Sequence, residues 1–305
     1  MITVQRLTKR YGAATAVDDV TFTARPGRVT GFLGPNGAGK STTMRMMVGL
    51  TQPTAGAAAV AGRRFTDLPN PGREVGVLLD ASAQHAGRTG REILTIAQQT
   101  MGLPRSRVEE LLGVVSLTDT EAARRVRDYS LGMRQRLGIA TALIGDPHTL
   151  ILDEPANGLD PAGIRWMRDL LRGYADRGGT VLLSSHLLHE IEVIADDLVV
   201  IGHGHIVARG TKAELLAGAG TLVRTRDRDG LVAALTATGT AYADHDAPNT
   251  PGVVTLRVDA DTEHVGAQAA RAGIALLELR PAEGAGLEDM FLELTATTQR
   301  EGAAA

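Results

Sequence analysis

The sequence predicts an α/β protein: a sheet domain with an inserted helical subdomain, followed by a small C-terminal α/β domain. Three observations favour this fold class. Short apolar runs alternate with helical patterns along the first two thirds of the 305 residues, the alternation stops between about residues 81 and 145, and a glycine-containing stretch at 218–220 precedes a second set of short elements. Such alternation is typical of a largely parallel sheet.

The expected elements follow in chain order. The apolar runs that predict strands lie at 17–22, 29–33, 75–79, 150–152, 181–183 and 198–201. The helical patterns lie at 41–50, 91–101, 131–144, 162–175 and 187–194. Strand or helix candidates beyond the glycines lie at 222–225, 231–238, 253–258, 263–272, 274–279 and 287–295. We expect a first domain over 1–216, with its helical subdomain at about 81–145, an accessory domain over 220–298, and a tail over 299–305.

Composition excludes several classes of function. A hydrophobic share of 43% is enough for a packed core, which argues against wholesale disorder. The formal net charge of -3 offers no basic surface, so no nucleic-acid partner is expected. Cysteine is absent, which excludes disulfides, thiolate metal sites and cysteine nucleophiles. No apolar run reaches the roughly 18 to 20 residues of a membrane helix, and no secretory signal is visible, so we expect a cytoplasmic protein.

A phosphate-binding loop follows the expected strand at 29–33. The sequence from Gly34 to Ser41 matches G-x-x-x-x-G-K-[ST] and precedes a helical pattern, which is the context this motif requires. Its glycines let successive backbone N–H groups turn around an anion. Lys40 is expected to bind the β- and γ-phosphates of ATP, and Ser41 to place its hydroxyl on Mg²⁺. The expected nucleotide-binding residues of this P-loop NTPase domain are Gly34, Pro35, Asn36, Gly37, Ala38, Gly39, Lys40, Ser41 and Thr42.

Two later strands also end in polar residues. The apolar run at 150–152 leads into Asp153, expected to hold Mg²⁺, and Glu154, the candidate base that accepts a proton from the attacking water. By themselves these carboxylates could form a solvated turn, but a P-loop in the same chain favours the catalytic interpretation. The run at 181–183 leads to His186, which can donate to a γ-phosphate oxygen and so distinguish ATP from ADP. Asp160 is expected to cap a helix that begins at Pro161.

The run Tyr129-Ser130-Leu131-Gly132-Met133-Arg134-Gln135-Arg136 resembles the signature loop and helix of ABC transporter ATP-binding subunits. The resemblance covers about residues 1–216. It implies that Ser130 and Gly132 bind nucleotide, that Asp153 and Glu154 are the Walker B pair, and that His186 is the switch histidine. Tyr11 falls where the family stacks an aromatic ring on adenine, with packing in a small core as the alternative.

The signature loop combines a helix N-terminus with a serine hydroxyl, and it lies too far along the chain to close on its own P-loop. We therefore expect it to serve another subunit's ATP, as in the family's head-to-tail homodimer with two nucleotides between the protomers. Two departures from the family pattern stand out. Leu131 and Met133 replace the usual glycine and glutamine, and Asp80 stands where a glutamine is usual. Asp80 could ligate Mg²⁺ or a bound water, or be a solvated loop residue.

Pieces around Asp80, at 89–91 and at 287–295 resemble the antibiotic and multidrug export branch, similar to daunorubicin-resistance ATPases. The resemblance implies an ATPase that powers a separately encoded integral membrane permease, and a peripheral position at the cytoplasmic face of the cell membrane. One alternative is a soluble ABC-type ATPase that acts as an ATP-driven clamp on the ribosome or DNA. Another is a regulatory protein that binds ATP without turnover, which the presence of Lys40, Asp153, Glu154 and His186 disfavours.

Overall fold

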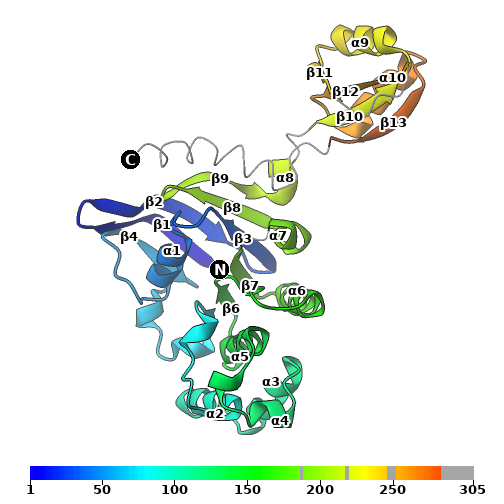
Figure 1. Cartoon of the computed structure of the whole chain (residues 1–305). Helices are drawn as coiled ribbons and strands as arrows, with labels where there is room; N and C mark the ends of the chain where they lie inside the picture. The colour runs from blue at the N-terminus through cyan, green and yellow to red at the C-terminus, as the bar shows by residue number, and fades with distance from the viewer. Residues whose placement is uncertain (186–187, 217–219, 246–251, 283–305) are drawn as a thin grey trace. The chain divides into compact units, whose positions relative to one another are not determined.

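The computed structural model describes residues 1–185, 188–216, 220–245 and 252–282. Its contact pattern divides the chain into two units, one over Met1–Lys212 and one that begins at Ala213 (Figure 1). The α/β fold class is confirmed. The domain limits expected from the sequence stay a prediction, because 287–295 and the tail lie outside the described residues.

The first unit is built on a six-stranded sheet with the order β5-β6-β7-β3-β8-β9. Its first five strands are parallel neighbours, and β9 runs antiparallel at the edge. The bounds are β3 (Arg28–Leu33), β5 (Val75–Leu78), β6 (Thr149–Leu152), β7 (Thr180–Ser184), β8 (Asp197–Gly202) and β9 (His205–Thr211). Because parallel strands share a direction, the loops after β3, β5, β6 and β7 open at one edge of the sheet.

A second, antiparallel sheet with the order β2-β1-β4 belongs to the same unit. Its strands are β1 (Ile2–Tyr11), β2 (Ala14–Ala24) and β4 (Ala55–Val60), and helix α1 (Lys40–Met47) packs against all three. Phe22 of β2 and Phe32 of β3 place their rings 5.3 Å apart, within one buried apolar cluster that includes Met44 of α1. This cluster fixes the helix that starts at the P-loop.

The segment between β5 and β6, residues 79–148, is largely helical and is called the helical insertion. Its helices are α2 (Gly90–Thr100), α3 (Ser106–Val114), α4 (Asp119–Ala122) and α5 (Leu131–Leu143), and Figure 1 shows them together at the lower end of the first unit. Thr89 with Glu92 and Thr118 with Glu121 form capping boxes that start α2 and α4. Arg91 joins Glu109 of α3 and Asp119 of α4, so one side chain of α2 ties both helices to it.

Two further helices, α6 (Pro161–Asp176) and α7 (Leu188–Ile194), follow β6 and β7. The start of α6 is the one expected: the Asp160 side chain accepts from the backbone N–H of Gly163 across 2.7 Å, and Pro161 is the first helical residue. None of the helices in the described part of the chain has both the length and the apolarity that a membrane span needs.

The second unit has the split βαβ topology of a ferredoxin-like fold. Its four antiparallel strands have the order β11-β12-β10-β13. The elements are α8 (Lys212–Leu216), which begins at the boundary, β10 (Thr221–Thr225), α9 (Arg228–Ala237), β11 (Tyr242–Asp244), β12 (Val254–Val258), α10 (Thr262–Arg271) and β13 (Leu276–Pro281). Val223, Leu231, Leu256 and Val265 form its own buried core.

Candidate active site

The P-loop joins β3 to α1, and close backbone contacts explain its glycines. A Cβ at position 34 would lie 2.4 Å from the carbonyl oxygen of Ile201, and one at position 39 would lie 2.6 Å from that of Ala16. Gly37 and Gly39 also have positive φ values, 82° and 106°. The loop is therefore held tightly against β8 and β2, in a conformation that side chains would prevent.

Lys40 is the buried cation of this loop, with 6% of the residue exposed. Its ammonium Nζ donates to the carbonyl oxygens of Gly34 and Pro35, across 2.6 Å and 3.2 Å. Burial holds the pKa of Lys40 below its ordinary value, and the nearby negative charges of Glu154 and Asp153 oppose that shift. A desolvated ammonium group at the P-loop is well placed to bind an anion.

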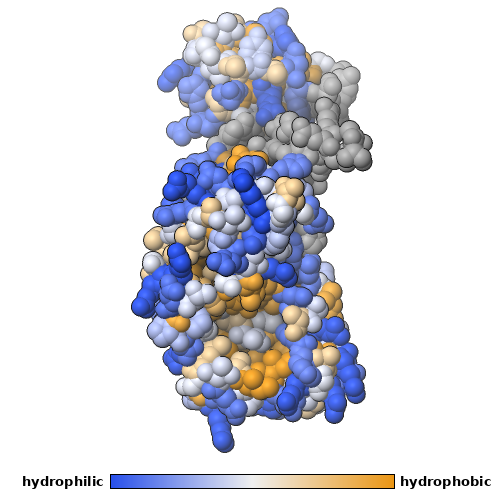
Figure 2. Space-filling view, turned by 90° about the vertical axis from the view of Figure 1, so that its left-hand side faces the viewer, coloured by the Kyte–Doolittle hydropathy of each residue, from blue (hydrophilic) through white to orange (hydrophobic). Residues whose placement is uncertain are grey.

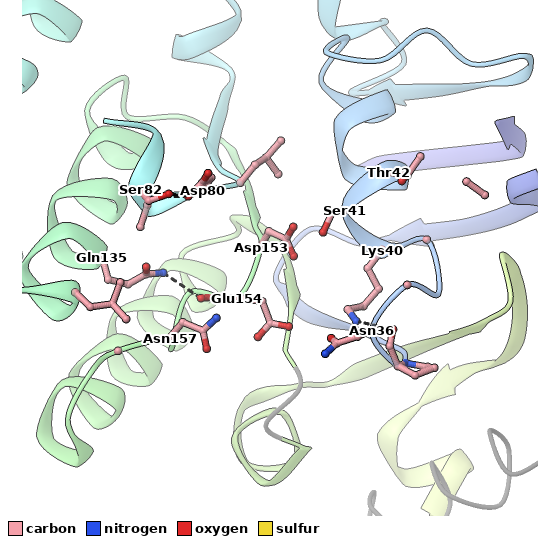
Figure 3. Close-up of a pocket in the computed structure, with 18 residues that line it drawn as sticks. Asn36, Lys40, Ser41, Thr42, Asp80, Ser82, Gln135, Asp153, Glu154 and Asn157 are labelled. Carbon is pink, nitrogen blue, oxygen red and sulfur yellow. Dashed lines mark hydrogen bonds between the residues drawn. The ribbon is translucent and has the colours of Figure 1, made fainter. Parts of the chain in front are cut away.

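A cavity of ≈ 570 Å³ opens beside Lys40. Figure 3 shows Lys40 and Asn36 on one side, Asp80 and Gln135 on the other, and the two carboxylates after β6 between them. Figure 2 shows apolar surface around a hollow in the lower half of the visible face, at the height that the helical insertion occupies in Figure 1. The residues that line the cavity are Ala16, Pro35, Asn36, Gly37, Gly39, Lys40, Ser41, Thr42, Leu79, Asp80, Ala81, Ser82, Leu131, Gln135, Asp153, Glu154, Asn157 and Gly158.

The end of β6 brings Asp153 and Glu154 into this cavity. The N–H of Asp153 donates to the carbonyl of Leu78 across 2.7 Å, continuing the pairing of β5 with β6. Ser184 of β7 donates its hydroxyl to Asp153 Oδ1 and accepts the N–H of Glu154 across 3.0 Å. Sequence reasoning missed this role of Ser184. Only the pairing of β6 with β7 could have predicted this contact. Leu152 lies opposite Leu183, so the residues that follow them, Asp153 and Ser184, are also neighbours.

The helical insertion supplies the opposite wall. Asp80 accepts hydrogen bonds from the hydroxyl and the backbone N–H of Ser82, across 2.6 Å and 2.7 Å, and these two bonds hold the pKa of Asp80 below its ordinary value. Gln135 of α5 is 3% exposed, and its Nε2 donates to the backbone carbonyl of Glu154 across 3.1 Å. Gln135 is the second residue that sequence reasoning missed, although it lies within the signature run at 129–136.

The signature loop begins α5. Ser130 caps this helix by accepting the N–H of Met133 across 3.2 Å, and it is exposed. A Cβ on Gly132 would lie 2.9 Å from the carbonyl oxygen of Gly158, so the loop abuts the segment that follows Glu154. Of the three residues 130–132, the cavity lining includes Leu131, which is 54% exposed, and neither Ser130 nor Gly132.

The remaining predicted site residues differ in where they lie. Gly34 and Ala38 shape the P-loop without lining the cavity. Tyr11 is 53% exposed, with Lys9 Nζ 4.9 Å from its ring centroid; it lies outside the cavity lining, and it does not pack in a core. His186 lies outside the described residues. The roles of all these residues stay predictions.

Comparisons with known proteins agree with this geometry. The ABC transporter family matches residues 17–157. The daunorubicin/doxorubicin resistance ATP-binding protein DrrA of Streptomyces peucetius is 39% identical over 222 residues, which cover 71% of this chain and 67% of that protein. Nod factor export ATP-binding protein I of Ralstonia nicotianae is 36% identical over 317 residues, which cover 99% of this chain and 95% of that protein.

A solved structure described as that of the ATP-binding subunit of an ABC transporter is 30% identical to this chain, with a TM-score of 0.65, and the match covers 70% of this chain and 91% of that one. The resemblance drawn from the signature run is thus confirmed. The chain belongs to the ATP-binding proteins of ABC transporters, and it is an ATPase coupled to transport.

Proposed function

We propose that this chain hydrolyses ATP to drive export of a hydrophobic drug or antibiotic through a separately encoded integral membrane permease, at the cytoplasmic face of the cell membrane. One relative is named for resistance to daunorubicin and doxorubicin, and another is named for Nod factor export. The observation that carries ATP hydrolysis is the cavity, which combines a buried lysine, two carboxylates at the end of β6 and the start of the signature helix. The export role is supported by the names of these relatives.

ATP would bind with its phosphates at the P-loop. The backbone N–H groups of the glycine-rich loop and of the first turn of α1 supply donors, and the ammonium group of Lys40 supplies charge. Lys40 now donates to two carbonyl oxygens of its own loop, and phosphate oxygens are stronger acceptors for the same N–H bonds. Thr42 adds a hydroxyl on the cavity side of α1.

The donors in the cavity suit Mg²⁺. Among the described residues, no three or more His, Cys, Asp or Glu side chains form a group that could hold a metal ion. Ser41, Asp153 and Asp80 all line the cavity and offer a sparse set of oxygen ligands. Mg²⁺ is usually bound by one or two carboxylates together with waters and phosphate oxygens. When bound, it would offset the negative charge of the phosphates.

Hydrolysis would use Glu154 as the base that accepts a proton from the attacking water, and His186 as a donor to the γ-phosphate. Each ATP would be bound by residues of two protomers. Ser130 and Gly132 are absent from the lining of their own chain's cavity, which supports a homodimer in which they bind the partner's ATP. ATP would then hold the two protomers together, and hydrolysis would loosen them.

The first experiment compares Glu154→Gln with a control variant, Glu74→Gln. Glu74 is an exposed carboxylate that precedes β5. We expect Glu154→Gln to lower kcat by roughly 100-fold or more, to keep ATP affinity, and to accumulate as an ATP-bound dimer in size-exclusion chromatography. Glu74→Gln should behave as wild type. Steady-state hydrolysis by Glu154→Gln at the wild-type rate would remove Glu154 as the base.

The second experiment tests the drug-export role. Cells that express the chain with its candidate permease should retain less daunorubicin than cells with the Glu154→Gln variant, measured by drug fluorescence. The chain should also co-purify with that permease from detergent-solubilised membranes. Hydrolysis stimulated by ribosomes or DNA, and unaffected by the permease, would instead support the soluble clamp.

A further inference from the structure

Gln135 is a buried polar side chain in the cavity wall to which the proposed function gives no role. It lies on α5, about one helical turn after the 130–132 loop, and it is 3% exposed. Its Nε2 donates to the carbonyl oxygen of Glu154 across 3.1 Å, the contact drawn as a dashed line in Figure 3. A buried amide bound to the peptide of the candidate base lies where it can affect the reaction.

The peptide that Gln135 contacts has an uncommon conformation. Glu154 has a φ of 51°, in the left-handed region that residues other than glycine rarely adopt. Its N–H donates to Ser184 Oγ across 3.0 Å, and its carbonyl also accepts the N–H of Asn157 across 3.2 Å. Ser184 is fully buried and also donates to Asp153. The conformation of Glu154 therefore depends on hydrogen bonds on both sides of the residue.

These three contacts come from different parts of the fold. Ser184 belongs to the sheet, and Asn157 belongs to the same loop as Glu154. Gln135 instead lies on the helix whose first residues form the 130–132 loop, and Gly132 of that loop abuts Gly158. The side chain of Gln135 therefore joins α5 directly to the carbonyl of Glu154.

We infer that Gln135 is a positioning residue for Glu154: it makes the alignment of the base depend on the position of the helix that begins at the 130–132 loop. This inference rests on the proposed roles of Glu154 and of that loop in binding the partner's ATP. Its consequence is a link between the two sites of the dimer. The base in one protomer is aligned when α5 of the same protomer is seated against the partner's triphosphate.

The test compares Gln135→Met with a matched variant, Gln98→Met. Methionine keeps the length of the side chain and removes the N–H donor. Gln98 is also buried, in α2 of the same insertion, and its amide also donates to a backbone carbonyl, that of Leu103, away from the cavity. We expect Gln135→Met to lower kcat roughly tenfold through misalignment of the base, with ATP affinity within about twofold of wild type. Gln98→Met should retain the wild-type kcat.

Two variants show whether Gln135 acts through Glu154. In the Glu154→Gln background, Gln135→Met should cause no further loss of the residual rate, because the group that it positions is already gone. A second tenfold loss there would overturn the inference. If Gln135→Met unfolds, Gln135→Glu keeps length and polarity but places an acceptor against the carbonyl, and the same tenfold loss is expected. A wild-type kcat in either folded variant, checked by circular dichroism, would also overturn it.

The link to the loop is tested with Ser130→Ala. The effects of Ser130→Ala and Gln135→Met on kcat should be less than additive, because both act on the same helix. Additive effects on kcat would contradict the proposed link between the two sites of the dimer. Failure of the proposed function gives a different result: Glu154→Gln alone would then turn over ATP at the wild-type rate, whatever Gln135 does.

Discussion

The two walls of the cavity are built differently. The wall from the sheet carries the P-loop and the carboxylates after β6, where Lys40 and Ser184 are buried and added Cβ atoms at Gly34 and Gly39 would collide with backbone. The wall from the helical insertion carries Asp80, held by Ser82 in its own loop, the buried Gln135 and the exposed Leu131. The phosphate chemistry is thus placed on the constrained part of the fold, and the exposed part is the one proposed to meet a second protomer.

The largest effect is expected on the wall from the sheet. Lys40→Ala removes a buried ammonium group, and charge-assisted hydrogen bonds of this kind contribute about 1.5–3 kcal/mol each. We expect the affinity for ATP to fall roughly 100-fold, measured by equilibrium binding of a fluorescent ATP analogue. Lys212→Ala, which removes a lysine that lies outside the cavity lining and donates to the backbone carbonyl of Glu192, is the control. Unchanged ATP affinity in Lys40→Ala would contradict the role of the P-loop.

A smaller effect of a different kind is expected on the insertion wall. Gly132→Ala places a Cβ 2.9 Å from the carbonyl oxygen of Gly158, so the 130–132 loop must shift against backbone. We expect kcat to fall roughly tenfold while ATP affinity is retained, because this loop is proposed to bind the partner's nucleotide. In Gly113→Ala, on α3 of the same insertion, the added Cβ meets nothing within 4 Å. Equal losses in the two variants would argue against a specific role for the loop.

The same contrast explains how far the sequence predicts the site. Lys40 and Ser41 belong to a motif of fixed spacing, so a local pattern places them on a P-loop. Asp153 and Glu154 follow an apolar strand, which is also a local signal. The contact of Ser184 with Asp153 depends on β7 lying beside β6, and the contact of Gln135 with Glu154 depends on which face of α5 meets the sheet. A sequence pattern of alternating strands and helices does not specify the order of the strands in the sheet or the rotation of a helix about its axis.

The fold shows the same limit. The parallel strands are continuous apolar runs because both of their faces are buried, and this local pattern predicts each of them. In the antiparallel sheet of β1, β2 and β4, the apolar pattern predicts a strand only at 17–22, within β2. Strand β4 has the sequence Ala-Gly-Ala-Ala-Ala-Val, which has weak strand propensity, and it forms by pairing with β1 over Ile2 to Thr8. Such a strand depends on its partner more than on its own residues.

A substitution at Trp166 measures how strongly α6, which packs on the sheet, is joined to the helical insertion. This tryptophan of α6, the only one in the chain, donates its indole N–H to the carbonyl of Val114 across 3.1 Å, and the guanidinium of Arg136 lies 4.4 Å from its ring centroid. Trp166→Phe keeps an aromatic ring and removes the donor. We expect the free energy of unfolding to fall by about 1 kcal/mol, measured by urea denaturation and circular dichroism, with kcat little changed. A loss above roughly 3 kcal/mol would mean that the ring itself, more than its N–H, joins the helices.

The smallest effect concerns the charge of Asp80. The hydroxyl and the N–H of Ser82 hold the pKa of this carboxyl below its ordinary value, so the bonds stabilise the fold above the unfolded-state pKa of about 3.9, and this contribution is lost as the pH falls through the lower folded-state pKa. Ser82→Ala removes the hydroxyl and should raise the pKa of Asp80, whereas Ser82→Thr should leave it low. Carbon-detected NMR titration of the carboxyl group measures both variants. Because Asp80 is exposed, the change in unfolding free energy should be smaller than that of Trp166→Phe. An unchanged pKa in Ser82→Ala would contradict this expectation and show that the backbone N–H of Ser82 alone holds the carboxylate.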